Sequence, residues 1–246
     1  EQALIDLGYD DVIDNYVVTE NISGVTSLNV YSKSISDLTG IESFVALNEL
    51  ACGTNPLGEV DLSNNTALTS LSIGLSQLTS LDVSNNTALT YLDCHLNEIT
   101  SLDVSANTAI TSISCRNNNL TELDLSNNTA LTQLWCYSNQ LTSLDVSANT
   151  ALTTLNCQAN QLTSLDVSAN TALTSLSLSA NNLTSLNVSA NSALTTLYCE
   201  NNQLTSLDVS NNTALTTLFC YYNQFTSLNM RNGVTDQLTT FNATNN

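Results

Sequence analysis

The sequence predicts a β-rich, right-handed solenoid of stacked parallel strands, with about one strand in each 21-residue coil and little helix. First, the consensus L-T-x-L-x-C-x-x-N-x-L-T-S-L-D-V-S-x-N-T-A recurs along nearly the whole chain. Second, its L-x-L-x-C segment alternates apolar and polar residues, which is the period of a strand. Third, no segment shows helical periodicity. A fixed period of this length is typical of a solenoid, in which each coil packs only on its neighbours.

Nine coils of 21 residues follow an earlier coil that begins at Val25 and is one residue longer. Neighbouring parallel strands lie about 4.8 Å apart, so ten coils should extend over roughly 45 to 50 Å. The regular coils begin at Leu47, Leu68, Leu89, Ile110, Leu131, Leu152, Leu173, Leu194 and Leu215.

Each coil contains two related halves. Positions 1–9 read L-x-x-L-x-C-x-x-N and form the first half, and positions 11–19 read L-x-x-L-x-V-x-x-N and form the second half. The apolar residues at positions 1, 4, 6, 11, 14, 16 and 21 should form continuous buried columns. The Asn at positions 9 and 19 should point inward and bond to backbone groups at the bends. We therefore expect a flattened coil with a second extended face.

These motifs resemble the leucine-rich repeat, whose signature is L-x-x-L-x-L-x-x-N, from Val25 to the end of the chain. The 21-residue unit with nested halves is similar to a short-coil bacterial subclass found in secreted and surface-anchored proteins. The first coil, with its "ISDLTGI" segment, resembles internalin repeats more closely. The resemblance implies a bacterial protein in an extracellular or cell-surface setting.

The two ends depart from the repeat. Residues 1–24 should form an N-terminal cap, because a solenoid needs its first apolar coil covered. Asp10, Asp11 and Asp14 loosely resemble a calcium loop but lack the required Gly turn and distal Glu. The solenoid, residues 25–246, ends with a two-residue insertion and a half-coil from Leu238. Since the half-coil stops at Asn246, we expect the native protein to continue.

All seven cysteines occupy position 6, where two other coils carry Ile73 and Leu178. The slot therefore suits a small apolar side chain, and free Cys packs well as one. Stacked side chains point in parallel rather than at one another, which disfavours both disulfides and a metal site. We expect buried free thiols at Cys52, Cys94, Cys115, Cys136, Cys157, Cys199 and Cys220.

The composition excludes several kinds of partner. The formal net charge is −19, from 22 acidic residues against Lys33, Arg116 and Arg231. So acidic a surface repels nucleic acid and anionic lipid. No apolar run approaches the roughly 20 residues that span a bilayer.

Position 15 carries Asp in most coils, including Asp103, Asp124 and Asp145. Like charges about 5 Å apart repel by roughly 0.8 kcal/mol per pair in water, which is tolerable if hydroxyls or amides donate to each carboxylate. Calcium between coils is an alternative, although the Gly-rich nonapeptide of β-rolls is missing. A Ser/Thr ladder could also bind ice, but the Asp row interrupts it. We favour a structural scaffold and expect no cofactor.

Variation concentrates at the outward positions 3, 5, 7 and 8 of the first half. In the 21-residue coils, seven of the chain's thirteen aromatic residues (eight Tyr, four Phe and one Trp) fall there. Exposed aromatic side chains on a rigid polar sheet are typical anchors of binding interfaces. We define a central cluster, a C-terminal cluster and one residue between them. The central cluster is Tyr91, Asp93, His95, Arg116, Trp135 and Tyr137; the C-terminal cluster is Tyr198, Glu200, Phe219, Tyr221 and Tyr222; Gln158 lies between.

We predict a non-catalytic extracellular recognition or adhesion module, a monomer that binds a protein or glycan on this face. The alternatives are a polysaccharide-binding module, a structural spacer, and a carbohydrate-active enzyme that would use Asp93, His95, Arg116 and Tyr137. Against the enzyme, nothing indicates a carboxylate pair at glycosidase spacing, and G-x-S-x-G, H-E-x-x-H and phosphate-loop motifs are absent.

Overall fold

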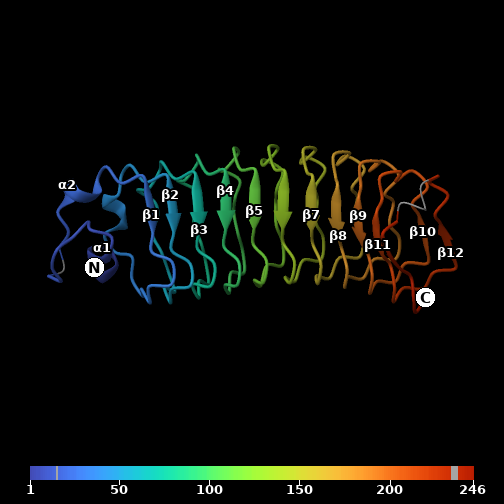
Figure 1. Cartoon of the computed structure of the whole chain (residues 1–246), viewed down its shortest axis with the longest axis horizontal. Helices are drawn as coiled ribbons and strands as arrows, with labels where there is room; N and C mark the ends of the chain where they lie inside the picture. Colours follow the sequence, from blue (N-terminus) through green and yellow to red (C-terminus); the bar gives the residue numbers. More distant parts are fainter. Residues whose placement is uncertain (15, 234–237) are drawn as a thin grey trace.

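Short parallel strands, one per coil, form a continuous sheet along one side of the solenoid in the computed structural model (Figure 1). The structure describes residues 1–14, 16–233 and 238–246. Within them the sheet has 11 strands in the order β1-β2-β3-β4-β5-β6-β7-β8-β9-β11-β13. The strands are β1 (Ser27–Asn29), β2 (Glu49–Ala51), β3 (Ser70–Ser72), β4 (Tyr91–Asp93), β5 (Ser112–Ser114), β6 (Gln133–Trp135), β7 (Thr154–Asn156), β8 (Ser175–Ser177), β9 (Thr196–Tyr198), β11 (Thr217–Phe219) and β13 (Thr240–Asn242). The predicted solenoid is confirmed.

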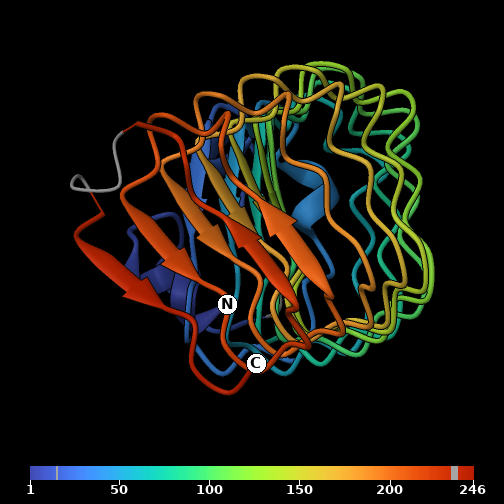
Figure 2. The same ribbon diagram turned by 90° about the vertical axis from the view of Figure 1, so that its right-hand side faces the viewer.

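The strands pair in register, coil upon coil. Ile113 of β5, for example, lies between Leu92 of β4 and Leu134 of β6. This central residue is position 4 of each coil and points into the core, whereas positions 3 and 5 point outward. Figure 2, a view along the solenoid, shows the coils stacked one behind another with their loops at the periphery.

Helix is confined to the start of the chain in the described residues. It consists of α1 (Gln2–Asp6), α2 (Thr19–Ile22) and the 3₁₀ helix η1 (Ile41–Ser43). Ala3 and Ile22 are buried against the solenoid core at this end. None of these helices has the length and apolar character that crossing a bilayer requires. At the other end β13 pairs with β11, and residues 234–237 of the predicted insertion lie outside the described residues.

The core consists of the predicted columns, with one correction. Positions 1, 4, 6, 11, 14 and 16 are buried in the central coils; Leu131, Leu134 and Cys136 have no exposed surface. Position 21 was also predicted to be buried, but Ala67 is half-exposed and Ala109 exposed. This prediction is wrong because the Ala lies at the corner that precedes position 1, where its short side chain does not reach the core.

The Asn at position 9 satisfies the backbone at one bend. The Asn139 side-chain amide donates to the carbonyls of Cys115 (3.0 Å) and Cys136 (3.1 Å) and accepts from the Leu120 amide (3.0 Å). One side chain thus joins two successive coils and leaves neither of its own polar atoms unpaired.

The Asn at position 19 donates hydrogen bonds to backbone carbonyls but accepts none from the described residues. The Asn149 amide nitrogen donates to the carbonyls of Leu125 (3.1 Å) and Asn128 (2.9 Å), but its Oδ1 is buried without a protein partner. The two predicted Asn columns are therefore chemically different. The same unpaired Oδ1 recurs in Asn65, Asn86, Asn107, Asn128, Asn149, Asn170, Asn191 and Asn212.

Position 8 adopts a left-handed backbone in every coil. Its φ lies between 51° and 59°, although most of these residues are neither Gly nor Asn. The conformation makes the sharp bend that follows each strand, so the side chains at positions 7 and 8 stand at one edge of the sheet. The residues are Ser32, Thr54, Leu75, Leu96, Asn117, Ser138, Ala159, Ala180, Asn201, Tyr222 and Asn245.

The second face is less regular than the first. In the described residues it forms a ladder only between β10 (Ser206–Asp208) and β12 (Ser227–Asn229), and the other second halves do not pair as strands. A shallow groove of about 660 Å³ lies across three unpaired coils, with Leu123 in its lining.

The Asp residues of position 15 are held within their own coils. Asp145 Oδ1 accepts the backbone amide of Ser147 at 2.9 Å, and Asn187 bonds Ser189 in the same way in another coil. Hydrogen bonds from Ser147 hold the pKa of Asp145 below its usual value. The expected donors to the Asp row are therefore present.

The seven cysteines are free and buried. Burial raises the pKa of the Cys115 and Cys157 thiols to about 12, because the apolar core disfavours the thiolate. The side chains of this column pack in the hydrophobic core as free thiols, as predicted.

Candidate binding face

The candidate site residues lie on the outward side of the first halves, along the 11-stranded sheet. Positions 3 and 5 belong to the strands, and positions 7 and 8 follow directly. His95, Arg116 and Tyr137 occupy position 7 of successive coils: the Leu96 amide bonds the Arg116 carbonyl at 3.0 Å, and the Asn117 amide bonds the Tyr137 carbonyl at 2.9 Å. The central cluster is thus one contiguous patch.

Asp93 and His95 form a pair within this patch. His95 Nδ1 lies 2.7 Å from Asp93 Oδ1, and the two side chains are 17% and 12% exposed. The His95 ring lies over Gly74 of the preceding coil, where an added Cβ would collide with it. Asp93 therefore lies beneath His95 rather than projecting into solvent.

Arg116 is also held in place. Its Nη1 donates to Ser114 Oγ at 2.6 Å, and its guanidinium carbon lies 5.9 Å from the centre of the Tyr137 ring. The contact with the ring is a cation–π interaction. Asp93, His95 and Arg116 therefore all have partners on this face.

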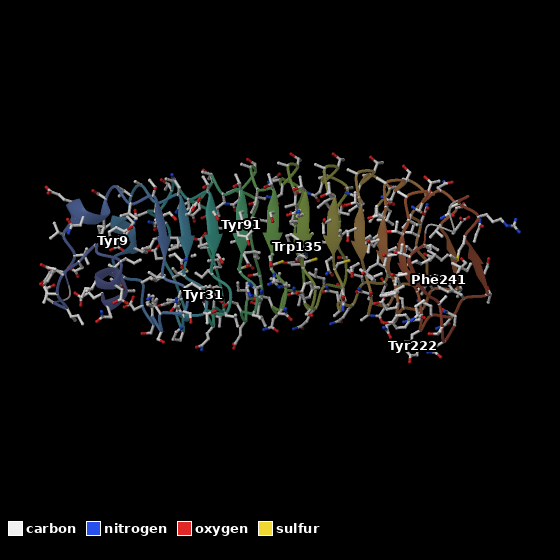
Figure 3. All side chains as sticks on the ribbon, viewed as in Figure 1. Tyr9, Tyr31, Tyr91, Trp135, Tyr222 and Phe241 are labelled. Atoms are coloured by element: carbon white, nitrogen blue, oxygen red, sulfur yellow. The ribbon has the colours of Figure 1, made fainter. Side chains whose placement is uncertain are left out.

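The other aromatic residues of the central cluster provide its contact area. Tyr91 is 37% exposed, and Trp135 and Tyr137 are half-buried. Partial burial, together with the Asp93 charge, raises the pKa of Tyr91. Figure 3 shows Tyr91 and Trp135 near the middle of the strand side. Gln158, one coil beyond Tyr137, is exposed.

The C-terminal cluster is a row of neighbouring rings. The ring centres of Tyr198 and Phe219 lie 5.2 Å apart, those of Phe219 and Tyr221 6.2 Å, and those of Tyr221 and Tyr222 5.4 Å. Tyr222, at the lower edge in Figure 3, is 53% exposed, and the other three are half-buried.

Glu200 stands in this row at position 7. Its Oε2 is buried and has no hydrogen-bond partner among the described residues. Its negative charge also affects a buried thiol: burial raises the pKa of Cys220 to about 11, and the nearby Glu200 carboxylate adds to that rise. Sequence reasoning placed Glu200 on the face but did not identify it as unpaired.

Sequence reasoning also missed part of the face near its start. Position 7 of the first four coils reads Tyr31, Gly53, Gly74 and His95. A Cβ on Gly53 would lie 2.7 Å from the Gly74 carbonyl oxygen and 3.3 Å from the Tyr31 ring, which is itself half-exposed. The two glycines thus form a low strip between two rings. Reading position 7 from coil to coil would have revealed it.

The groove on the second face does not include these residues. It is lined by carboxylates and serines, among them Asp103, Glu122 and Asp124. In the part of the chain that the structure describes, no three His, Cys, Asp or Glu side chains are grouped to hold a metal ion.

Comparison with known proteins identifies the fold. No family model matches the chain. A segment of 47 residues, 19% of this chain, is 44% identical to Internalin J of Listeria monocytogenes and covers 5% of that protein. Among solved structures, the functional domain of InlJ from Listeria monocytogenes is 32% identical, with a TM-score of 0.54, over 87% of this chain and 64% of that one.

Two further structures share the fold at lower identity. A leucine-rich repeat protein of Leptospira interrogans is 23% identical with a TM-score of 0.80, over 92% of this chain and 62% of that one. The internalin InlF of Listeria monocytogenes is 20% identical with a TM-score of 0.56, over 98% and 92%.

The solenoid is thus a leucine-rich repeat fold, similar to those of bacterial internalins. The InlJ domain is described as including a cysteine ladder, and the position-6 column forms such a ladder here. The chain covers less than two thirds of the InlJ domain and of the Leptospira protein.

Proposed function

We propose that this chain is a non-catalytic recognition module that binds a protein through the outward side of its first halves, outside or on the surface of a bacterial cell. Internalin-like leucine-rich repeat folds generally serve recognition. The observation that carries the proposal is the gathering of seven aromatic residues on one face of a rigid frame. Aromatic anchors in such patches carry most of the energy of protein interfaces.

The frame supports tight binding because it is ordered before the partner arrives. The central coils are bonded to their neighbours through their strands and their position-9 Asn, as at Asn139. Arg116 and His95 are already held by contacts within the face. Little conformational entropy is then lost on docking, and more of the contact energy appears as affinity.

The same contacts argue against catalysis at this face. Asp93 is covered and could only orient His95, and the central cluster has no second carboxylate to act beside it. Arg116 is bound to Ser114 and lies near the Tyr137 ring. The central cluster therefore lacks the pair of carboxylates that glycosidases use.

Arrays of purified proteins and of glycans, probed with the labelled chain, test the proposal. We expect protein spots that bind the wild type and lose signal when Trp135→Ala and Tyr137→Ala are combined. The control combines Ser143→Ala and Ser164→Ala, two exposed positions of the second half, and should retain binding. Far-UV circular dichroism checks that both variants remain folded.

The sole Trp supplies a second measurement. Trp135 is half-buried at the centre of the face, so a bound protein should shift or quench its emission. Array binding that survives the Trp135 and Tyr137 changes but fails in the control would place recognition on the second face and refute the proposal.

A further inference from the structure

The C-terminal cluster contains a charge that the protein itself does not neutralise. Glu200 Oε2 is buried, yet no side chain or backbone group in the described residues donates to it. Buried carboxylates are normally paired or hydrogen-bonded, because removal from water is costly. Glu200 as a residue is half-exposed, so a donor from outside the chain can reach its carboxylate.

No basic residue of the chain can supply that donor. Lys33 lies 3.4 Å from Asp6 at the N-terminal end, and Arg116 bonds Ser114 in the central cluster. Arg231 is exposed at position 17, in the second half of its coil. With a net charge of −19, the protein attracts cationic partners to this site.

The surroundings of Glu200 favour a flat cation. Tyr198 precedes it by two residues, and Tyr221 occupies position 7 of the next coil, where the Asn201 amide bonds the Tyr221 carbonyl at 3.0 Å. Phe219 lies between these two rings, 5.2 Å and 6.2 Å from them. The faces of aromatic rings attract cations, and a guanidinium can stack on a ring while donating two hydrogen bonds to a carboxylate.

The neighbouring coil offers no charged alternative. Ser179, at position 7 of the preceding coil, is buried, and its hydroxyl also lacks a partner. A serine hydroxyl donates one neutral hydrogen bond, which does not compensate a negative charge. In the central cluster, by contrast, Asp93 is paired with His95.

We infer that Glu200, with the rings of Tyr198, Phe219 and Tyr221, is a receptor for a basic side chain of the partner protein, arginine in preference to lysine. The inference rests on the proposed function and specifies its chemistry. The partner would present an arginine from a basic segment, stacked on the rings and paired with the carboxylate.

Three tripeptides titrated into the whole chain at physiological salt test this inference. The probes are acetyl-Gly-Arg-Gly-amide, its lysine analogue and its citrulline analogue, which keeps the arginine shape without the charge. Proton NMR of the Tyr rings reports binding. We expect the arginine peptide to bind most tightly and to shift the ring signals of Tyr198 and Tyr221. The Tyr198→Phe and Tyr221→Phe variants, in whose spectra these signals change, assign them. The citrulline peptide should leave them unchanged.

Two variants that each remove one negative charge distinguish binding at this site from general electrostatic attraction to an acidic protein. Glu200→Gln should weaken binding of the arginine peptide at least tenfold, whereas Asp166→Asn, an exposed position of the second half, should change it less than twofold. Equal weakening by the two changes would overturn the inference. So would binding of citrulline as tight as that of arginine, or ring shifts caused only by a neutral disaccharide such as cellobiose, which would indicate glycan stacking.

Failure of this inference is separable from failure of the proposed function. A protein found on the arrays that loses binding with Trp135→Ala and Tyr137→Ala, but binds Glu200→Gln and Tyr221→Ala normally, would sustain the proposed function and refute the arginine site. A loss of binding at least tenfold with Glu200→Gln, restored in part when the partner's arginine is also replaced, would support both.

Discussion

Replacing Ala159 with Gly should stabilise the protein, although Ala→Gly changes usually destabilise. Ala159 occupies position 8 with φ of 52°, in the left-handed region. Ala169 is its matched control: it is also half-exposed and lies in the same coil at position 18, and its φ is outside that region. The two changes remove the same methyl group and differ in the backbone conformation that the methyl group must tolerate.

The expected magnitudes follow from two opposing effects. A non-Gly residue in the left-handed conformation costs about 1 to 2 kcal/mol, which Gly avoids. Gly loses about 0.5 to 1 kcal/mol more conformational entropy on folding than Ala. Ala159→Gly should therefore gain about 0.5 to 1 kcal/mol, and Ala169→Gly should lose about the same. At about 2 to 4 °C per kcal/mol for a chain of this size, the two Tm values should move by about 1 to 4 °C in opposite directions.

Thermal and urea unfolding followed by far-UV circular dichroism measure both variants. Trp135 emission supplies a second probe from the middle of the sheet. A fall in stability for Ala159→Gly as large as that for Ala169→Gly would show that the bend after the strand is not strained and would refute the reasoning for all the position-8 residues.

Three further predictions concern the interior and the second face. Asn139→Ala should lower the free energy of unfolding by about 2 to 4 kcal/mol, because it leaves the Leu120 amide and several carbonyls unpaired. Asn149→Ala should lower it by about half as much, because it leaves only carbonyls unpaired. Urea unfolding measures both. The Cys157 thiol, with its pKa raised from 9.0 to about 12, contributes stability that is complete below pH 9 and is lost as the pH rises towards 12, by about 1.4 kcal/mol per unit. Cys157→Val should therefore move the midpoint of alkaline unfolding to higher pH, as followed by circular dichroism. Asp145→Asn should keep the bond to the Ser147 amide, as Asn187 does to Ser189, but lose the small stabilisation that the charged carboxylate provides at neutral pH. The lowered pKa of Asp145 contributes stability at pH values above the usual pKa of Asp, and this stability is lost as the pH falls through the lowered pKa. In the variant, the free energy of unfolding should therefore fall less steeply as the pH is lowered.

The repeat made most of the fold predictable. Leu or Ile at position 4 is the central residue of each regular strand, and the Asn at position 9 bonds successive coils. The second face was predicted less well, since its L-x-x-L-x-V pattern suits a strand but pairing also requires close coils. Only β10 and β12 pair as strands on this face in the described residues. Spacing between coils is a property of the stack and leaves no trace in one repeat.

The residues of the candidate site were predictable as a set, but their contacts were not. The outward positions follow from the strand period, so the sequence alone places Arg116 and Tyr137 side by side. The cover of Asp93 by His95 depends on Gly74, a residue 21 positions earlier that has no side chain. The bend at position 8 was missed because Ala159 and the other residues found there lack the usual preference for positive φ.

The strain at position 8 and the unpaired Glu200 lie along the same edge of the sheet. Leu75 and Tyr222 adopt left-handed backbones there and are 41% and 53% exposed. A fold that stacks ten coils gains enough from its shared core and Asn columns to carry such costs in every coil. Side chains at this edge can therefore differ without loss of the fold, since neither Leu75 nor Tyr222 at position 8 disturbs the bonds that hold the neighbouring coils. This freedom is the physical reason that sequence variation is concentrated beside the strands while the second half repeats almost unchanged.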